Sequence, residues 1–282
     1  MSPSDLDAWL PDASRRTLVM GVLNVTPDSF SDGGRFAARD AAVARAMEMI
    51  EEGADLIDVG GESTRPGSRP VPADEQIARV VPVIMAVAPQ VVVSIDTTRA
   101  AVAEVALEAG ATVVNDISAG RDDPGMFPLV ARRKAVIVLM HMQGTPATMQ
   151  KNPRYDNVVL EVEQFLCERM DVAVSAGLER NRILVDPGIG FGKSVEHNLT
   201  LLREQRTLCR LGRPVVIGTS RKGFIGRITE EPEPARRLFG TAASVAWSVA
   251  NGAAMVRVHD VKAMVQVVRM TQAIRSGSTG DF

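Results

Sequence analysis

The sequence predicts an α/β protein, a single-domain (β/α)8 TIM barrel, and two observations carry this prediction. Eight short apolar runs alternate with longer amphipathic stretches from Leu18 to the C-terminal region. Nearly continuous apolar runs are typical of parallel strands that helices cover on the outside. Eight such cycles without a linker can close into a barrel, for which 282 residues is an ordinary length. An open doubly wound sheet is the competing fold, but no GxGxxG turn follows the first run.

The predicted strands are the apolar runs, taken in order: residues 18–24 (LVMGVLN), 55–60 (DLIDVG), 91–96 (VVVSID), 112–117 (TVVNDI), 135–141 (AVIVLMH), 182–188 (RILVDPG), 214–218 (PVVIG) and 254–259 (AMVRVH). Between them, apolar residues recur at helical spacing, as in residues 40–54 (DAAVARAMEMIEEGA) and 100–111 (AAVAEVALEAGA). Glycines follow four of these stretches, where a helix end favours positive φ: Gly53, Gly110, Gly177 and Gly252.

The barrel is expected to occupy residues 18–275. Residues 1–17 form an N-terminal extension in this interpretation, and residues 5–10 within it are expected to form a short helix that closes the bottom of the barrel. Residues 276–282 (SGSTGDF) are small and polar, which predicts a flexible tail.

Composition excludes several classes of function. The net charge of −2 gives no electrostatic reason to expect binding to nucleic acid or to an anionic membrane. The apolar runs have the length of strands and are interrupted by charge, so no membrane span is expected. The N-terminus lacks the apolar core of a secretion signal. Two cysteines, Cys167 and Cys209, indicate neither a disulfide framework nor a zinc site, and a cytoplasmic location is expected.

Polar side chains stand at or just after the ends of the predicted strands. They are Asn24, Glu62, Asp96, Asn115, Asp116, His141, Asp186, Ser220, Arg221, Lys222, Arg257 and His259. In a barrel these ends face one mouth, where active sites of this fold are built. Helix capping does not explain Lys222, Arg257 or His259. It does not explain carboxylates inside apolar runs either, because burying them is costly unless they are paired. Asp58 and Glu62 are expected to orient the loop after the second strand and the neighbouring site.

The chemistry of this set predicts a substrate. Asp96, Asn115 and Asp186 offer mostly acceptors, which suit a planar heterocycle rich in N–H donors. Arg257 and His259 follow the eighth strand and supply donors and positive charge for phosphate oxygens. We therefore expect a planar, nitrogen-rich ring that carries a phosphorylated arm.

Two further positions complete this expectation. Asn24 is a neutral oxygen ligand that could hold Mg²⁺, which keeps several waters and takes phosphate oxygens as ligands. Lys222 lies between the ring-binding group and the phosphate-binding group.

Two loops of unusual composition add to the mouth. Residues 60–72 (GGESTRPGSRPVP) carry Thr64 and Arg65 among glycines and prolines. Residues 188–194 (GIGFGKS) are expected to bring Phe191 and Lys193 to the mouth, and the spacing does not match a Walker A loop. Phe191 could anchor the loop, or it could pack against a second, aromatic substrate.

Seven motifs resemble the dihydropteroate synthase family, in order, over about residues 18–275. They are MGVLNVTPDSFSDGG (20–34), DVGGESTRPG (58–67), SIDT (94–97), NDI (115–117), DPGIGFGK (186–193), GTSRKGFIG (218–226) and RVHDV (257–261). The resemblance implies a folate-pathway transferase that joins 6-hydroxymethyl-7,8-dihydropterin pyrophosphate to p-aminobenzoate. The expected products are 7,8-dihydropteroate and pyrophosphate, with Mg²⁺ as cofactor and a dissociative (SN1-like) mechanism. It further implies a homodimer and competition by sulfonamides.

The resemblance also implies residue roles. Pterin binding is assigned to Asp96, Asn115, Asp186 and Lys222. Pyrophosphate binding is assigned to Asn24, which also holds the metal, and to Thr64, Arg257 and His259. The p-aminobenzoate position is assigned to Phe30, Arg65, Pro66, Phe191, Ser220 and Arg221. The expected catalytic residues are Lys222, Arg257, His259, Asp96 and Asp186. Residues 25–34, which include Phe30, are expected to close over the substrates as a lid.

Two alternative functions stay open. A pterin-binding methyltransferase domain shares the acceptors for the ring but has no need of the RVHD and SRK elements together with the first loop. A non-catalytic pterin-binding barrel is disfavoured because the first and second loops are intact.

Overall fold

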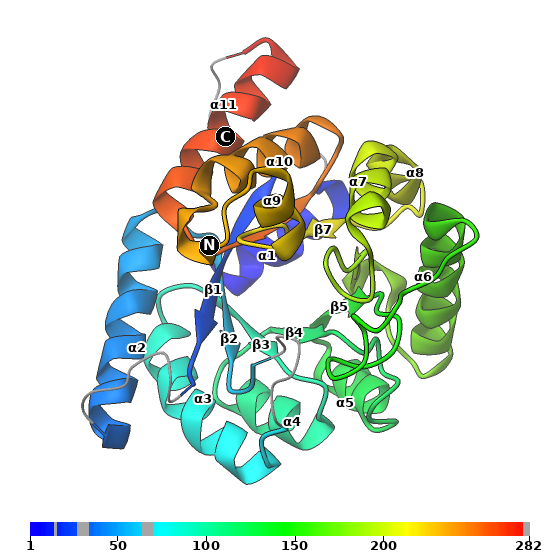
Figure 1. Ribbon diagram of the computed structural model, residues 1–282. Coiled ribbons are helices and arrows are strands. Elements are labelled where there is room, and N and C mark those ends of the chain that lie inside the picture. The colour runs from blue at the N-terminus through cyan, green and yellow to red at the C-terminus, as the bar shows by residue number, and fades with distance from the viewer. Residues whose placement is uncertain (14–15, 27–33, 64–69, 279–282) are drawn as a thin grey trace.

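The computed structural model describes residues 1–13, 16–26, 34–63 and 70–278, with only the backbone described for residues 34–37 (Figure 1). All eight predicted strands are present: β1 (Leu18–Asn24), β2 (Leu56–Gly60), β3 (Val92–Asp96), β4 (Val113–Asp116), β5 (Val136–Met140), β6 (Ile183–Asp186), β7 (Val216–Ile217) and β8 (Met255–Val258). The first matches its predicted run, and the others begin one or two residues inside theirs; β2 and β3 end where predicted, and the remaining strands end one or two residues early.

The strands form one parallel barrel. Hydrogen-bonded neighbours follow the order β6-β5-β4-β3-β2-β1-β8-β7. The remaining gap is closed by a parallel bridge between Val185 and Val215, where the Val185 N–H donates to the Pro214 carbonyl at 3.0 Å. Strand β7 is short at this seam, and Pro214 has no N–H with which to extend the ladder. The barrel prediction is therefore confirmed, and the open doubly wound sheet is excluded.

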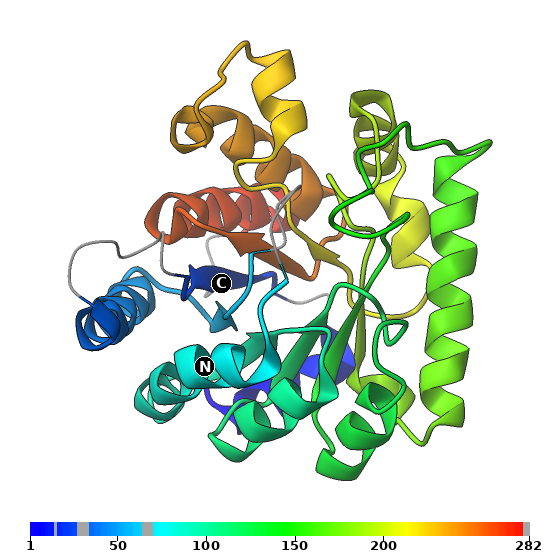
Figure 2. The same cartoon turned by 60° about the horizontal axis from the view of Figure 1, so that its bottom comes forward.

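Helices surround the strands on the outside (Figure 2). They are α2 (Gly34–Glu51), α3 (Ala73–Val87), α4 (Ala100–Glu108), α5 (Met126–Arg133), α6 (Val158–Ser175), α7 (Val195–Arg203), α8 (Gln205–Cys209), α9 (Gly223–Ile228), α10 (Leu238–Ala250) and α11 (Val261–Ser276). The four glycines predicted to follow helices all have positive φ, as expected. No helix within the described ranges has both the length and the apolar character needed to cross a membrane.

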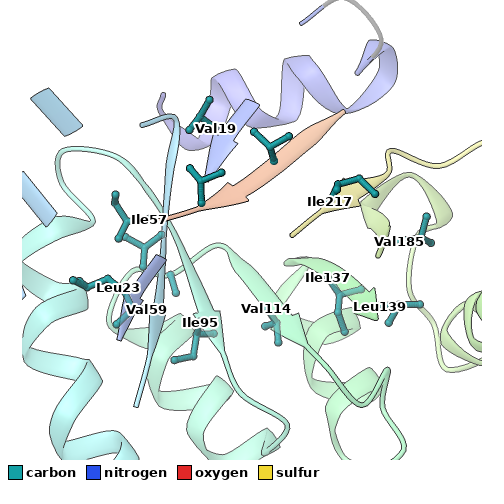
Figure 3. Packing of buried hydrophobic residues seen from close by; sticks show 14 of the residues in the cluster. Val19, Leu23, Ile57, Val59, Ile95, Val114, Ile137, Leu139, Val185 and Ile217 are labelled. Atoms are coloured by element: carbon teal, nitrogen blue, oxygen red, sulfur yellow. The ribbon is translucent and has the colours of Figure 1, made fainter. Parts of the chain in front are cut away.

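Side chains alternate between two layers along each strand, because successive residues point to opposite faces. Residues facing the helices form the outer core, including Val19, Ile57, Ile95, Val114 and Ile137 (Figure 3). Residues facing the barrel axis near the strand starts form a second cluster. This inner cluster contains Leu18, Met20, Leu56, Val92, Val113, Val136, Val138, Leu184, Val216 and Met255.

The N-terminal segment closes the bottom of the barrel, as predicted. Helix α1 (Pro3–Trp9) begins with a capping box at Ser2. Its residues Leu6 and Trp9, together with Leu10, pack into the inner cluster. The Trp9 Nε1–H also donates to the Arg16 carbonyl at 2.9 Å. The plug is thus held both by apolar packing and by a hydrogen bond.

We expect Leu6→Ala to lower the free energy of unfolding by about 2–4 kcal/mol, because it opens a cavity under the barrel. Leu6 is almost completely buried, whereas Leu160 on α6 is about half exposed. Leu160→Ala is therefore the matched control and should cost less than about 0.5 kcal/mol. Urea denaturation of both variants measures the difference. Equal losses would show that α1 does not stabilise the barrel.

The same alternation gives the upper half of the barrel its polar interior. Leu56 faces the barrel axis, so Asp58, two residues later, faces it as well. Asp96 lies four residues after Val92 on β3, and Arg257 lies two residues after Met255 on β8, so both also face the barrel axis. Apolar side chains therefore fill the bottom of the barrel, and charged side chains fill the mouth.

Candidate active site

A cavity of about 830 Å³ opens at the carboxyl ends of the strands. Every predicted site residue that the structure describes lines it: Asn24, Asp96, Asn115, Asp186, Phe191, Ser220, Arg221, Lys222, Arg257 and His259. The remaining predicted residues, Phe30, Thr64, Arg65 and Pro66, lie outside the described residues, as does most of the predicted lid. Strand ends that are far apart in the sequence are thus brought to one cavity, and their polar side chains share it.

Arg257 is the centre of a charged network in the wall of the cavity. Its Nε donates to Asp58 Oδ2 at 2.6 Å, and its Nη2 donates to Asp96 Oδ2 at 2.7 Å. Asn115 Nδ2 donates to the same Asp58 oxygen at 3.0 Å. The Nη1 group of Arg257 has no partner among the described residues, so it is available to a ligand.

The two predicted ring-binding carboxylates are buried. Burial raises the pKa of Asp96 to about 7, although the positive charge of Arg257 opposes the rise. Burial also raises the pKa of Asp186, and the Gly188 N–H, which donates to Asp186 Oδ1 at 2.7 Å, acts in the opposite direction. A ligand that donates N–H groups to these carboxylates would favour their ionised forms.

Lys222 and Phe191 meet on the far side of the cavity. The Lys222 ammonium lies 4.0 Å from the centroid of the Phe191 ring, a cation–π contact. Burial and the nearby Arg257 lower the pKa of Lys222 to about 8. Gly190 permits this approach: it has φ +84°, and a Cβ there would lie 3.0 Å from Lys222 Cδ. The Phe191 ring therefore forms part of the cavity wall and does not only anchor its own loop.

The surroundings of His259 favour its neutral form when no anionic ligand is present. Burial and the adjacent Arg257 lower the pKa of His259 to about 3, so the ring is neutral near neutral pH. Its Nδ1 lies 3.0 Å from Ser220 Oγ, and its backbone N–H donates to the same oxygen at 3.2 Å. His259 is thus oriented by the seventh loop and offers a neutral hydrogen-bonding group.

Arg221 lines the cavity, but its guanidinium is paired with another loop. Its Nε donates to Asp260 Oδ2 at 3.1 Å, and its Nη2 donates to Asp260 Oδ1. Arg221 also has φ +60°, and Arg237 donates to its carbonyl at 2.9 Å. These contacts join the loops after β7 and β8 and fix the backbone that carries Ser220 and Lys222.

Lys193 borders the cavity at the mouth, as predicted, but its ammonium is held by its own loop. Its buried ammonium donates to the carbonyls of Gly188 and Phe191 at 3.0 and 2.9 Å and lies 2.9 Å from His141 Nδ1. Gly188 has φ +68°, and a Cβ there would lie 1.9 Å from the His141 carbonyl oxygen. The loop therefore curls tightly around the Lys193 ammonium, which holds Phe191 in place.

One of the two residues expected to orient the second loop does so. Glu62 accepts hydrogen bonds from the Val71 N–H at 3.3 Å and from Gln76 Nε2 at 2.6 Å. Asp58 does not contact this loop among the described residues; it holds Arg257 and Asn115 instead. These contacts agree with the expectation that Asp58 orients the site beside the second loop, although its two partners were not predicted.

Asn24 fits the role of a Mg²⁺ ligand. It ends β1, lines the cavity, and its side chain has no hydrogen-bond partner among the described residues. Within the described ranges no three His, Cys, Asp or Glu side chains form a metal cluster. Mg²⁺ at a phosphate needs only one or two protein oxygens, since water and phosphate provide the rest. One amide oxygen beside a phosphate site is therefore a suitable donor set.

Comparisons with known proteins agree with this geometry. The family model described as pterin binding enzyme matches residues 20–259. A dihydropteroate synthase from Synechocystis sp. is 46% identical over 274 residues, which cover 96% of this chain and 95% of that protein.

Two solved structures are similar over nearly the whole chain. The Xanthomonas albilineans dihydropteroate synthase with 4-aminobenzoic acid has a TM-score of 0.87 at 46% identity, covering 93% of this chain and 94% of that one. The Yersinia pestis dihydropteroate synthase in a sulfonamide drug complex has a TM-score of 0.88 at 42% identity, covering 94% and 96%.

The barrel, its acceptor-lined cavity and the family match define the class of protein: the chain belongs to the pterin-binding enzymes. Within that class it belongs to the dihydropteroate synthases, the transferases of folate biosynthesis.

Proposed function

We propose that the protein joins 6-hydroxymethyl-7,8-dihydropterin pyrophosphate to p-aminobenzoate and releases pyrophosphate and 7,8-dihydropteroate. One observation carries this proposal: a wall of acceptors, a group of phosphate-binding donors and an aromatic side chain share one cavity. The X. albilineans relative was solved with 4-aminobenzoic acid, and a second structure of that enzyme contains 7,8-dihydropteroate.

The pterin ring is bound by Asp96, Asn115 and Asp186 in this proposal. Asp186 keeps Oδ2 open to the cavity because Gly188 occupies only Oδ1. The three side chains offer acceptors to the N–H edge of the ring. Lys222, whose ammonium has no hydrogen-bond partner among the described residues, donates to ring acceptors.

The pyrophosphate lies against Asn24, His259 and the free Nη1 group of Arg257, with Thr64 as the fourth proposed contact. Asn24 would hold Mg²⁺, which would supply positive charge next to the leaving pyrophosphate. His259 donates a hydrogen bond as a neutral imidazole, oriented by Ser220. Arg257 supplies the fixed positive charge on this side of the cavity.

We propose a dissociative mechanism. The bond between the pterin methylene and pyrophosphate breaks first, and its electron pair leaves with pyrophosphate. The methylene cation is delocalised into the ring, and the carboxylates of Asp96 and Asp186 stabilise it through the ring N–H groups. The amine of p-aminobenzoate then forms the new C–N bond and loses one proton. No protein nucleophile is required, and Cys167 and Cys209 lie away from the cavity lining.

The p-aminobenzoate ring packs on Phe191 in this proposal, beside Ser220 and Arg221. The support is that Phe191 is fixed by the Lys193 contacts and lies under Lys222. Phe30, Arg65 and Pro66 are the proposed contacts from the first and second loops. Sulfonamides are proposed to compete at this position, because the Y. pestis relative was solved in complex with a sulfonamide drug.

The test is pyrophosphate release measured with each substrate alone and with both, before and after metal chelation. The proposal requires release only when both substrates and Mg²⁺ are present, together with 7,8-dihydropteroate in equal amount. Pterin binding without release would indicate a non-catalytic barrel. Methyl transfer to or from a pterin, without pyrophosphate release, would indicate the methyltransferase alternative.

Pterin affinity should rise with pH between about 6 and 7.5. The pKa of Asp96 is about 7 in the free protein, because burial outweighs the effect of Arg257. Ring N–H groups require the ionised carboxylate, so binding below pH 7 must release a proton. Affinity should therefore fall by up to about tenfold per pH unit as the pH drops below 7. Calorimetry at several pH values measures this, and Asp96→Asn should remove the dependence. A flat profile in the unmodified protein would exclude Asp96 as the titrating group.

We propose that the protein is a cytoplasmic homodimer. Helices α10 and α11 lie side by side and expose large apolar side chains, among them Phe239, Trp247, Met270 and Ile274. Phe239 is 86% exposed and shares these two helices with the other three exposed apolar side chains, and grouped exposed apolar side chains are typical of protein–protein interfaces.

Phe239→Asp should therefore shift the protein from dimer to monomer in light scattering coupled to size exclusion, with no loss of thermal stability of the monomer. Met85→Asp, on the exposed face of α3, is the control and should leave the mass unchanged. A monomeric unmodified protein at micromolar concentration would refute the dimer.

A further inference from the structure

Asp58 lies behind the ring-binding wall and is completely buried on β2. It is not among the residues that line the cavity, so it does not contact a ligand there. Its Oδ2 nevertheless accepts hydrogen bonds from two residues that do line the cavity, Arg257 at 2.6 Å and Asn115 at 3.0 Å. The buried Asp58 carboxylate therefore contacts one residue of the predicted ring-binding group, Asn115, and one of the predicted phosphate-binding group, Arg257.

The contact to Asn115 settles which way that amide faces. An amide can offer either its oxygen or its NH2 group to a ligand, whereas a carboxylate can only accept. Because Asp58 takes the NH2 group of Asn115, the amide oxygen is left for the cavity. This oxygen accepts no hydrogen bond from the described residues. Asn115 therefore presents an acceptor, as Asp96 and Asp186 do.

We propose that Asp58 is a positioning residue that sets the hydrogen-bonding sense of the ring site. It makes Asn115 an acceptor and holds the Arg257 guanidinium so that Nη2 meets Asp96 and Nη1 faces the ligand. The site then selects a ring edge that carries N–H donors over one that carries acceptors. This inference rests on the proposed function, because it concerns the same pterin site.

The contacts of Asp58 allow its role as a hydrogen-bond acceptor to be tested separately from its negative charge. Both donors share one oxygen, so an asparagine at this position that places its amide oxygen there keeps both hydrogen bonds. Its NH2 group would then replace Oδ1, which is buried without a partner. Ser94 is paired with Asp58 in the β2–β3 register, and its Oγ is also buried without a partner. Asp58→Asn is therefore the conservative variant, and Asp58→Ala removes the acceptor.

The experiment measures the affinity of the full chain for 6-hydroxymethylpterin by calorimetry, without turnover. Asp58→Ala should weaken binding at least about tenfold, whereas Asp58→Asn should stay within about threefold. If Asp58 acts through Asn115, the losses from Asp58→Ala and Asn115→Ala should not add in the double variant. Additive losses, or equal losses in both Asp58 variants, would overturn the proposal.

A second pair of variants keeps the test decisive if Asp58→Ala does not fold. Asn115→Asp places two acceptors against each other and should weaken pterin binding at least about tenfold. Adding Asp58→Asn removes the negative charge that faces the new carboxylate on β4 and should recover part of that loss, while the asparagine oxygen still accepts from Arg257. No recovery in a folded double variant would overturn the proposal. Failure of the unmodified protein to bind the pterin would instead contradict the proposed function.

Discussion

Replacing Arg257 with methionine should lower kcat/KM for 7,8-dihydropteroate formation by about 1,000-fold, the largest loss we expect from one substitution in the cavity. The guanidinium pairs with Asp58 and Asp96, and its Nη1, which has no partner among the described residues, is the proposed contact to pyrophosphate. Its removal leaves two buried carboxylates without a counter-charge, which costs about 3–5 kcal/mol for a buried pair. The same change removes the fixed positive charge at the leaving group, so binding and chemistry are both affected.

Comparing Arg257→Lys with Arg257→Met distinguishes the positive charge of Arg257 from the planar shape of its guanidinium. Arg257→Lys keeps one positive charge but cannot reach both carboxylates with a planar fork, so its activity should lie between those of Arg257→Met and the unmodified protein. Arg210→Met, an exposed arginine outside the cavity, should leave kcat/KM within about threefold. Steady-state kinetics on the three variants, with thermal unfolding to confirm their fold, measures this. Full activity in Arg257→Met would remove Arg257 from the mechanism.

Asp96→Asn should weaken binding of the pterin pyrophosphate by about 10- to 100-fold. The substitution removes the charge that accepts ring N–H groups and half of the counter-charge held against Arg257. A hydrogen bond to a charged group is worth about 1.5–3 kcal/mol, which corresponds to that range. Calorimetry of the isolated pterin substrate measures the loss without turnover.

The matched control for Asp96 is Asp156→Asn, because Asp156 is exposed and lies outside the cavity lining. Its affinity should not differ measurably from that of the unmodified protein. The fold of Asp96→Asn should persist, since the side chain is isosteric and the Arg257–Asp58 contact remains. Unchanged pterin affinity in Asp96→Asn would remove Asp96 from the ring site.

Strand periodicity made much of the site predictable. Residues at the ends of parallel strands converge in a barrel whatever their separation in sequence, so Asp96, Asp186 and Arg257 could be grouped before their distances were known. The N-terminal helix that closes the bottom of the barrel was also expected, over residues 5–10. These features depend on the order of the strands and on the pattern of apolar and polar residues along them, and both can be read from the sequence.

Side-chain contacts across the barrel could not be predicted from strand order and periodicity. Asp58 meets Arg257 and Asn115 because closure brings β2, β4 and β8 around one axis, and the reach of each side chain decides the pairing. Lys193 was correctly expected at the mouth, but its hydrogen bonds were not predictable, because the positive φ of the loop glycines turns carbonyl groups inward around its ammonium. The neutral state of His259 likewise depends on burial and on Arg257 nearby, which sequence spacing does not give.

A crystal structure of the protein with 7,8-dihydropteroate would show the orientation of the pterin ring in the cavity. We expect ring N–H groups to lie about 3 Å from the oxygens of Asp96, Asn115 and Asp186, with the aminobenzoate ring against Phe191. A pterin ring bound outside this cavity, or one that turns its acceptor edge to these three side chains, would contradict this expectation.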